Sequence, residues 1–402
     1  MTALRPLASS PARFSAPVGN ILQIRPRVRT AILLPSGCRF SAAHPNSMET
    51  VVRTLAAPLA DQDVRIFCCE GAEDHGLPGV EALPSRGPER LRLLADRLRT
   101  FRPEVIEHHQ QVRQAVAIRA LVPQAAHLLY RHNALKAPRH WIDRWRYQNR
   151  YAAMDGFIFV SEAERAAFAR AFPELADRAR SAPNPIDATA WLAPPEQKQP
   201  LVAFAGRAMP EKGVDVLCAA LPAVLDRHPD WRAVLMLNDW DQHAGWAAPH
   251  VAALGRYGSR VTVLKSAPLA EVRRQMRLAA IALTPSTWAE PFGLTAVEAH
   301  AAGAALISSG RGGLREASGP HALYVDEVTP GSLARAMEHL IRHPLERIEL
   351  ARAAQAYVLE THSPVERANG LLRIRQAAAL ARRRRGAGEE KSPTRTPGWK
   401  VR

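Results

Sequence analysis

The stretch TPSTWAEPFGLTAVEAHAAGAALISSGRGGLRE, residues 284–316, carries the most information in the chain. An apolar run over 279–283 precedes it and predicts a short buried strand that ends at Thr284. From Leu294 onward, apolar residues recur at helical spacing, and a second apolar run over 304–307 leads into a glycine-rich turn. Strand, loop, helix and strand in this order predict a βαβ unit, whose ligand-binding edge is where strands end and helices begin.

Two carboxylates of this stretch, Glu290 and Glu298, are predicted to face one crevice from different heights, because one lies in the loop and the other in the helix. The backbone N–H groups at Gly293, Leu294 and Thr295 would be unpaired at the helix start, where the helix dipole also favours an anion. Donors ready for phosphate beside two carboxylates suit a sugar nucleotide. The alternative is that Glu290 caps the helix and Glu298 is a solvated surface residue.

The segment EPFGLTAVEA, residues 290–299, followed by AAGAALISSGRGGLRE, resembles the E-x7-E donor segment of retaining glycosyltransferases of family 4. A second stretch agrees with this resemblance. A predicted strand over 201–205 precedes GRAMPEKG, residues 206–213, which is similar to the GR-x3-EKG element of that family. The resemblance implies the GT-B fold, in which two Rossmann-like parallel-sheet domains face each other across a cleft. The predicted fold class is therefore α/β.

The chain length of 402 residues also suits two domains. Residues 1–28 contain Ser, Pro, Ala and Arg without a long apolar core, so a disordered segment is expected there rather than a secretory signal. The other predicted segments are an N-terminal acceptor-side Rossmann-like domain over 29–192, a hinge over 193–200, a nucleotide-sugar-binding domain over 201–361, a helix over 362–384 that crosses back to the first domain, and a basic disordered tail over 385–402.

Alternating apolar and helical stretches in the first half predict a parallel sheet covered on both faces. His108 and His109 are expected just after a strand over 105–107, and His132 just after a strand over 127–130, all near the interdomain edge. A histidine in such a place is more often a packed or surface residue than a catalytic one. The resemblance implies that His132 contacts the donor sugar, and His109 is considered for the acceptor side.

The resemblance also implies roles for the residues of the donor site. Arg207 and Lys212 would neutralise the diphosphate of the donor, and the alternative for them is ordinary surface charge. Glu290 would orient the hydroxyl groups of the sugar, and Glu298 would hold the ribose. With His132, the predicted catalytic set is then Glu290, Arg207 and Lys212. The other donor-binding candidates are Gly37, Gly206, Phe292, Gly293, Leu294 and Thr295. The family often has two adjacent glycines in its first loop, where this chain offers only Gly37.

Two Asp-x-Asp pairs, Asp61/Asp63 and Asp239/Asp241, are read as turn residues, because two carboxylates alone are a weak metal signal. The resemblance implies an enzyme that needs no metal and no other cofactor. The four cysteines have no metal-binding spacing, which indicates buried free thiols in a reducing cytosol.

The net charge of +16 is concentrated at the two ends of the chain. Residues 1–48 hold six arginines and no acid, and residues 382–402 hold eight Lys or Arg against two Glu, so that only +4 remains for residues 49–381. This distribution argues against a nucleic-acid groove in the folded body. It fits adhesion of the ends to an anionic membrane, with disordered solubilising termini as the alternative. The run Arg382–Arg385 is read as a solvated helix end.

The sequence therefore predicts a hexosyltransferase that moves a sugar from a UDP- or GDP-hexose to a glycan or lipid-linked acceptor with retention of configuration. Lipopolysaccharide or exopolysaccharide synthesis is the expected process, in the cytoplasm and peripherally at the inner membrane face. The alternative is a non-catalytic sugar-nucleotide-binding or scaffold protein that keeps the fold. The departure in the first loop favours this alternative, whereas the intact Arg207, Lys212, Glu290 and Glu298 speak against it.

Overall fold

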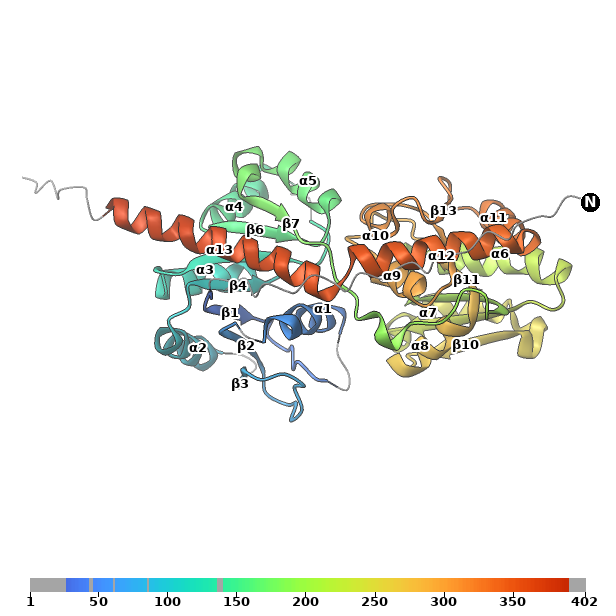
Figure 1. Ribbon diagram of the computed structural model, residues 1–402, viewed down its shortest axis with the longest axis horizontal. Helices are drawn as coiled ribbons and strands as arrows, with labels where there is room; N and C mark the ends of the chain where they lie inside the picture. Colours follow the sequence, from blue (N-terminus) through green and yellow to red (C-terminus); the bar gives the residue numbers. More distant parts are fainter. Residues whose placement is uncertain (1–26, 43–45, 61, 85–86, 136–139, 390–402) are drawn as a thin grey trace, which may run out of the picture.

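The computed structural model describes residues 27–42, 46–60, 62–84, 87–135 and 140–389. Two α/β domains lie side by side, and a long C-terminal helix returns from the second domain across the first (Figure 1). The fold confirms the predicted α/β class with two parallel sheets. Almost all of the segment 1–28, the tail from residue 390 and Asp61 lie outside the described residues, so the expectations for them stay predictions.

The N-terminal domain is built around a seven-stranded sheet in the order β3-β2-β1-β4-β5-β6-β7, with every pair parallel. The strands are β1 Thr30–Leu33, β2 Val64–Cys69, β3 Val80–Leu83, β4 Val105–His109, β5 Ala126–Arg131, β6 Gly156–Phe159 and β7 Ala179–Ser181. The helices are α1 Ser47–Ala56, α2 Pro88–Phe101, α3 Val112–Leu121, α4 Trp141–Ala152 and α5 Glu162–Ala171. The short strands β3 and β7 at the sheet edges are not expected from the apolar pattern.

Two helix starts in this domain show how local chemistry sets the boundaries. Asn46 caps α1 and exchanges hydrogen bonds with Glu49, which forms a complete capping box. Ser161 accepts from the backbone N–H of Glu164 at the start of α5, but the Glu164 carboxylate accepts from Leu135 N instead of closing the box. The capping box expected at α5 is therefore only half formed.

The C-terminal domain has a six-stranded parallel sheet in the order β10-β9-β8-β11-β12-β13. Its strands are β8 Gln199–Arg207, β9 Arg232–Asn238, β10 Val261–Lys265, β11 Ala279–Thr284, β12 Ala305–Ser308 and β13 Leu323–Tyr324. Its helices are α6 Val214–Arg227, α7 Trp240–Ala252, α8 Leu269–Leu278, α9 Leu294–Ala301, α10 Leu314–Ser318, α11 Pro330–Arg342 and α12 Pro344–Thr361. Asp241 lies in the first turn of α7 rather than in a turn, and Asp239 precedes that helix with a left-handed backbone (φ 54°).

The last helix, α13 Pro364–Glu389, crosses back onto the N-terminal domain, as the sequence predicts (Figure 1). Its Arg375 is fully buried and makes a two-pronged ion pair with Glu107 of β4, with both N–O distances 2.8 Å. Burial alone would raise the pKa of Glu107, but the charge and hydrogen bonds of Arg375 hold this pKa at about 2. Pairing with a buried arginine thus fixes α13 against the sheet.

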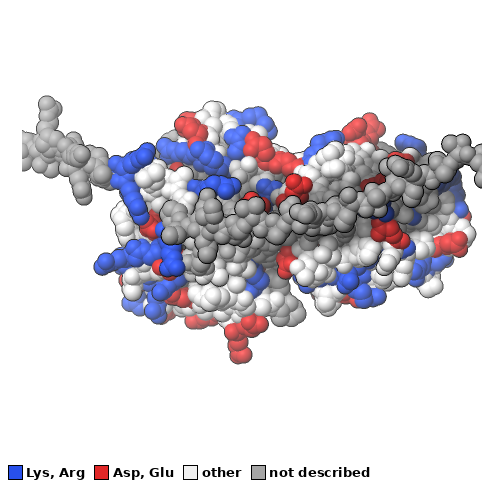
Figure 2. Space-filling view, viewed as in Figure 1, with Lys and Arg blue, Asp and Glu red and all other residues white. Residues whose placement is uncertain are grey.

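The end of α13 corrects the interpretation of residues 382–385 as a solvated helix end. Arg382 donates to the carbonyl of Pro123 (2.5 Å), and Arg385 pairs with Asp155 (2.6 Å). Arg383 forms an ion pair with Glu104. The helix also continues five residues beyond the expected end at 384, to Glu389. Lys and Arg side chains gather at this end of the molecule, over the N-terminal domain (Figure 2).

A contact between the domains shows how the two sheets are oriented. The Glu316 carboxylate, on α10, accepts from the backbone N–H groups of Glu162 and Ala163, both at 2.6 Å, at the start of α5. Helix α5 follows the carboxyl end of β6, and α10 follows that of β12. The carboxyl ends of the two parallel sheets therefore face each other, which is where ligands bind in open α/β folds.

Candidate active site

Two loops of the C-terminal domain pack together to form the base of the site: residues 209–213 after β8, and residues 285–293 after β11, called the donor loop below. Thr287 N donates to Glu211 O (3.0 Å). Gly213 adopts a left-handed conformation (φ 70°), and a Cβ atom there would lie 2.2 Å from Pro285 O. Only glycine fits this position, because both the backbone angle and the close approach exclude a side chain.

Glu290 is buried, with 6 % of its surface exposed, and its carboxylate has two partners. Its Oε1 accepts from Lys212 Nζ at 2.6 Å and from Ser286 Oγ at 2.5 Å. The residue that starts α9 is Gly293, which has no side-chain cap. The alternative that Glu290 caps the helix is therefore wrong, and the alternative of ordinary surface charge is wrong for Lys212.

The glycine-rich turn after β12 holds the backbone of Glu290. Gly312 forms a parallel bridge with Glu290, and Gly313 N donates to Glu290 O (2.7 Å). A Cβ atom on Gly312 would lie 2.3 Å from that oxygen, so the two backbones meet at a distance that only glycine permits. The spacing of the two motif segments thus positions one carboxylate.

The start of α9 offers backbone donors, as the sequence predicts. Gly293 has φ 111°, and Leu294 and Thr295 open the helix without a side-chain acceptor for their N–H groups. Phe292 is buried and packs edge-on against His362 at 5.5 Å between ring centroids. Since His362 also bonds to Asn184 O (3.0 Å) in the link between the domains, the donor loop is in direct contact with the interdomain hinge.

Glu298 is half-buried one turn further along α9, so it is not a fully solvated surface residue. Burial raises its pKa to about 7, and the guanidinium of Arg273 on α8 opposes this shift. The charge state of Glu298 consequently changes near neutral pH. Arg273 also lies over the ring of Trp191, at 5.4 Å from its centroid.

Arg207 ends β8 directly after Gly206, and its side chain is exposed. Among the described residues, no ion pair or side-chain hydrogen bond involves the Arg207 guanidinium. Asn238, which pairs with Arg207 across the sheet, precedes Asp239 at the end of β9. Arg207 is therefore free to bind an anion at the carboxyl end of the sheet.

On the N-terminal side, the structure brings two of the three weighed histidines together. His109 Nδ1 and His132 Nε2 are 2.8 Å apart, and both rings stack with Tyr130. Burial, and then the neighbouring His109, lower the pKa of His132 well below its usual value, so that His132 is neutral at pH 7. The other nitrogen of His109 lies 3.8 Å from Glu107.

His108 is not part of this pair. Both His108 and His109 lie within β4 rather than after it, and successive side chains of a strand point to opposite faces. His108 is consequently buried against His127, at 2.9 Å between ring nitrogens, and burial lowers the pKa of both. The expectation that His108 lies near the interdomain edge is wrong.

Gly37 lies in the turn after β1 with a left-handed backbone (φ 90°), and nothing lies within 4 Å of where its Cβ would be. Its N–H donates to Cys69 Sγ (2.9 Å). The neighbouring Ser36 accepts from the side chain of Gln111, at the start of α3 (2.9 Å). This first loop is thus joined to the acceptor-side elements, and no described contact joins it to the donor loop.

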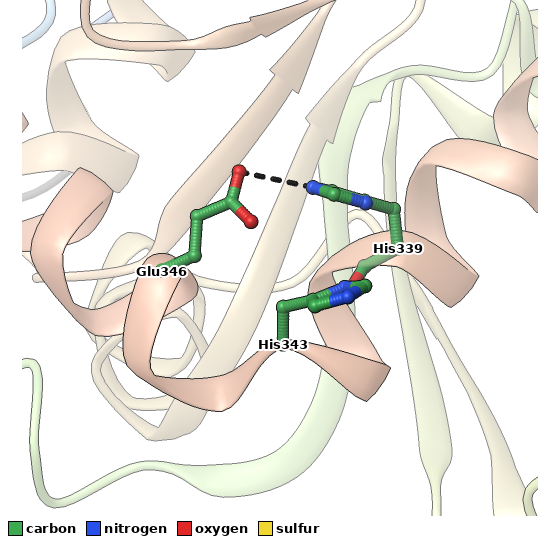
Figure 3. Close-up of side chains that lie close together, drawn as sticks. All are labelled: His339, His343 and Glu346. Atoms are coloured by element: carbon green, nitrogen blue, oxygen red, sulfur yellow. Dashed lines mark hydrogen bonds and ion pairs between the residues drawn. The ribbon is translucent and has the colours of Figure 1, made fainter.

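A further group of potential metal ligands lies where α11 meets α12 (Figure 3). Ring nitrogens of His339 and His343 and an oxygen of Glu346 lie within 4.8 Å of one another, and His339 bonds to Glu346 at 3.0 Å. The three side chains are partly or fully exposed. This group links two consecutive helices, and none of its members is a donor-site residue.

Three residues of the site, Ser286, Arg273 and Glu316, are not predicted from the sequence, although the quoted stretch contains the first and the last. A hydroxyl four residues before Glu290 is a signal that sequence reasoning can use. Arg273 and the pair Glu107–Arg375 leave no such signal, because their partners come from distant parts of the chain.

Comparisons with known proteins follow this geometry domain by domain. Residues 48–190 match the family model described as Glycosyltransferase Family 4, and residues 199–343 match the one described as Glycosyl transferases group 1. The D-inositol 3-phosphate glycosyltransferase of Rhodococcus opacus is 33 % identical over 238 residues, which are 56 % of this chain and 52 % of the relative. The chain thus spans about half the length of the curated relatives it matches first.

Solved structures share the whole fold. HepE of Anabaena, in complex with UDP and glucose, superposes with a TM-score of 0.70 at 18 % identity, covering 88 % of this chain and 100 % of that one. The sucrose-phosphate synthase of Thermosynechococcus elongatus gives 0.69 at 20 % identity, covering 90 % and 100 %. The two family models in tandem, on two facing parallel-sheet domains, place this chain among the GT-B glycosyltransferases of family 4 type.

Proposed function

We propose that this protein transfers a hexose from a UDP- or GDP-hexose to a glycan or lipid-linked acceptor, with retention of the anomeric configuration. The observation that carries the proposal is the cluster at the donor loop. An uncapped helix start, a buried Glu290–Lys212 pair and an unpaired Arg207 lie at one sheet edge. A sugar diphosphate has complementary chemistry, since its hydroxyls donate to a carboxylate and its phosphates accept from cations and backbone N–H groups. HepE, which shares the fold, is in complex with UDP, and this favours a uridine donor.

Donor binding would exchange the partners within the cluster. The diphosphate would take the place of Glu290 as the partner of Lys212, and Glu290 would then accept from hydroxyl groups of the sugar. Arg207 would hold the second charge of the diphosphate, and Glu298 the ribose. Preorganised charges of this kind stabilise a leaving group whose negative charge grows as the anomeric bond breaks.

In the proposed reaction, the bond between C1 and the phosphate oxygen breaks and the acceptor oxygen bonds to C1 on the same face. The acceptor proton passes to a phosphate oxygen of the leaving nucleotide. His132 would contact the sugar from the opposite domain. With the proton of His109 on the nitrogen facing Glu107, His132 would donate to His109 and leave its Nδ1 to accept from a sugar hydroxyl.

The membrane part of the proposal draws support from α4. Trp141 and Trp145 lie on one face of this helix with 77 % and 59 % of their surfaces exposed, and the exposed Arg144 and Arg146 flank them. Tryptophan and arginine are the residues that favour the interface between a bilayer and water. No described helix is both long and apolar enough to cross a membrane. A peripheral position beside a lipid-linked acceptor of lipopolysaccharide or exopolysaccharide synthesis fits these observations.

The test is a screen of UDP- and GDP-hexoses for slow hydrolysis and for thermal stabilisation of the protein, followed by NMR of the anomeric configuration of the product. We expect stabilisation by one nucleotide family and a product with the configuration of the donor. An inverted product would contradict the mechanism, and binding without any turnover would favour the non-catalytic alternative. We also expect activity in EDTA, since side chains and a helix start meet the phosphate charge; loss of activity that Mg²⁺ restores would contradict this.

A further inference from the structure

A cavity of about 630 Å³ opens in the N-terminal domain between α3, α4 and the ends of β4 and β5. It is called the acceptor cavity below. Its volume is within the range of sites for small ligands. Gln110 and Asn133, which line it, are the direct neighbours in sequence of His109 and His132. The cavity is therefore adjacent to the histidine pair.

Positive charge in the acceptor cavity has no carboxylate counterpart. Arg113, Arg131 and Arg150 line it, whereas no Asp or Glu is among its lining residues. Among the described residues none of the three arginines forms an ion pair, and Arg131 Nε is buried without a hydrogen-bond partner. Glu164 acts on Arg131 electrostatically, but it is buried, bonded to Leu135 N and outside the lining. Unpaired guanidinium groups that converge in a cavity require an anion to offset their mutual repulsion.

The backbone adds donors to the same space. Helix α3, ten residues long, begins at Val112 in the cavity wall, and no side chain caps its start. Its free N–H groups and its dipole favour an anion. Gln110 before it has a left-handed backbone (φ 67°), which is costly for a residue other than glycine and is typical of functional sites. In the orientation that satisfies both groups, its side-chain oxygen accepts from His132 N (2.7 Å) and Asn133 N (2.8 Å).

We infer that the acceptor cavity binds the phosphate group of a phosphorylated polyol or sugar, and that this compound is the acceptor. The inference rests on the proposed transferase function and specifies its substrate class. Guanidinium groups match the geometry of phosphate oxygens with paired hydrogen bonds, and Tyr147 and Asn133 remain for the hydroxyl groups of the ring. Bound in this way, the acceptor lies next to His132, which would contact the donor sugar.

The phosphate can be carried by a soluble sugar phosphate or by a lipid headgroup. Helix α4 is compatible with both sources, because Tyr147 and Arg150 face the cavity while Trp141 and Trp145 are on the opposite, exposed side. The experiment therefore uses two probes. One is glucose 6-phosphate in solution, with glucose as the uncharged reference, and the other is a vesicle containing phosphatidylinositol, with a phosphatidylcholine vesicle as the reference.

The test compares three proteins by calorimetry and vesicle sedimentation: the wild type, R113Q/R150Q, and the control R92Q/R170Q. The control removes the same charge from exposed positions of the same domain outside the cavity. We expect the wild type to bind one phosphorylated probe at least about tenfold more tightly than its reference, as charge-assisted hydrogen bonds imply. R113Q/R150Q should lose this preference and the control should keep it.

Binding of glucose 6-phosphate identifies a soluble acceptor class, and binding of the phosphatidylinositol vesicle alone identifies a lipid-borne one. Equal binding of each probe and its reference, or equal losses in both double variants, would overturn the inference. Wild-type affinity for UDP and GDP is measured on the same samples. Phosphate binding without nucleotide binding would contradict the proposed function and leave this inference standing, and the reverse result would do the opposite.

Discussion

In the donor loop, Lys212 and Glu290 neutralise each other, whereas in the acceptor cavity Arg113, Arg131 and Arg150 meet no carboxylate among the lining residues. The donor side is a closed network in which a ligand must exchange partners. The acceptor side is an open set of donors that waits for an anion. This difference indicates that donor binding is tuned by competition within the protein, while acceptor binding depends on uncompensated charge.

The acceptor side rests on a buried ion pair, and removing one partner is the strongest way to break the comparison. Replacement of Arg375 by Met leaves Glu107 charged and unpaired in the core, which should lower the free energy of unfolding by about 3–5 kcal/mol. Urea denaturation measures this loss. Arg373→Met, on the exposed side of the same helix, should change stability by less than about 0.5 kcal/mol. Equal stability of the two variants would show that the pair does not fix α13.

On the donor side, Lys212→Ala or Arg207→Ala should each lower kcat by roughly 100-fold, because a preorganised charge facing the leaving group is lost. Arg335→Ala, an exposed change in the same domain, is the control. Lys212 and Glu290 are bonded, so the double variant Lys212→Ala/Glu290→Gln should lose less than the two single losses combined. Wild-type transfer rates in both single variants would remove the diphosphate role from these residues.

The pH dependence of nucleotide binding sharpens the assignment of Glu298. Its pKa of about 7 means that the carboxylate, which accepts from ribose hydroxyls, becomes the main form only above neutral pH. Affinity for UDP or GDP should therefore rise by about tenfold between pH 6 and 8, following the ionised fraction. Calorimetry of Glu298→Gln should show a flatter profile, which corrects for titration of the nucleotide itself. A Gln variant with the wild-type slope would rule out the ribose role.

The smallest effect concerns the membrane. If α4 provides the contact, W141S/W145S should sediment less with anionic vesicles and transfer less to a lipid-embedded acceptor, and attraction should weaken with salt. If the basic tail provides it, deletion of residues 390–402 should have this effect instead. The deletion starts there because Arg383 and Arg385 form ion pairs with the folded domain. Unchanged sedimentation of both proteins would contradict peripheral membrane binding.

The donor loop could be predicted well from the sequence because its parts are close together along the chain. Glycine positions, helix starts and the interval between Glu290 and Glu298 follow from local backbone geometry, which short motifs specify. The loop after β8 joins it through one further motif that contains Lys212. The alternation of strands and helices likewise indicated two parallel sheets, since apolar periodicity is a local property.

Only the tertiary structure shows how Lys212 bonds to Glu290, how Glu316 reaches the start of α5, and how Arg375 meets Glu107. The acceptor cavity is of the same kind, because its arginines come from α3, the end of β5 and α4. Such contacts join residues that are tens to hundreds of positions apart, so no local pattern encodes them. The sequence by itself thus determined the fold class and the donor motif, whereas packing of distant elements decided which charges are paired and which remain free to bind a ligand.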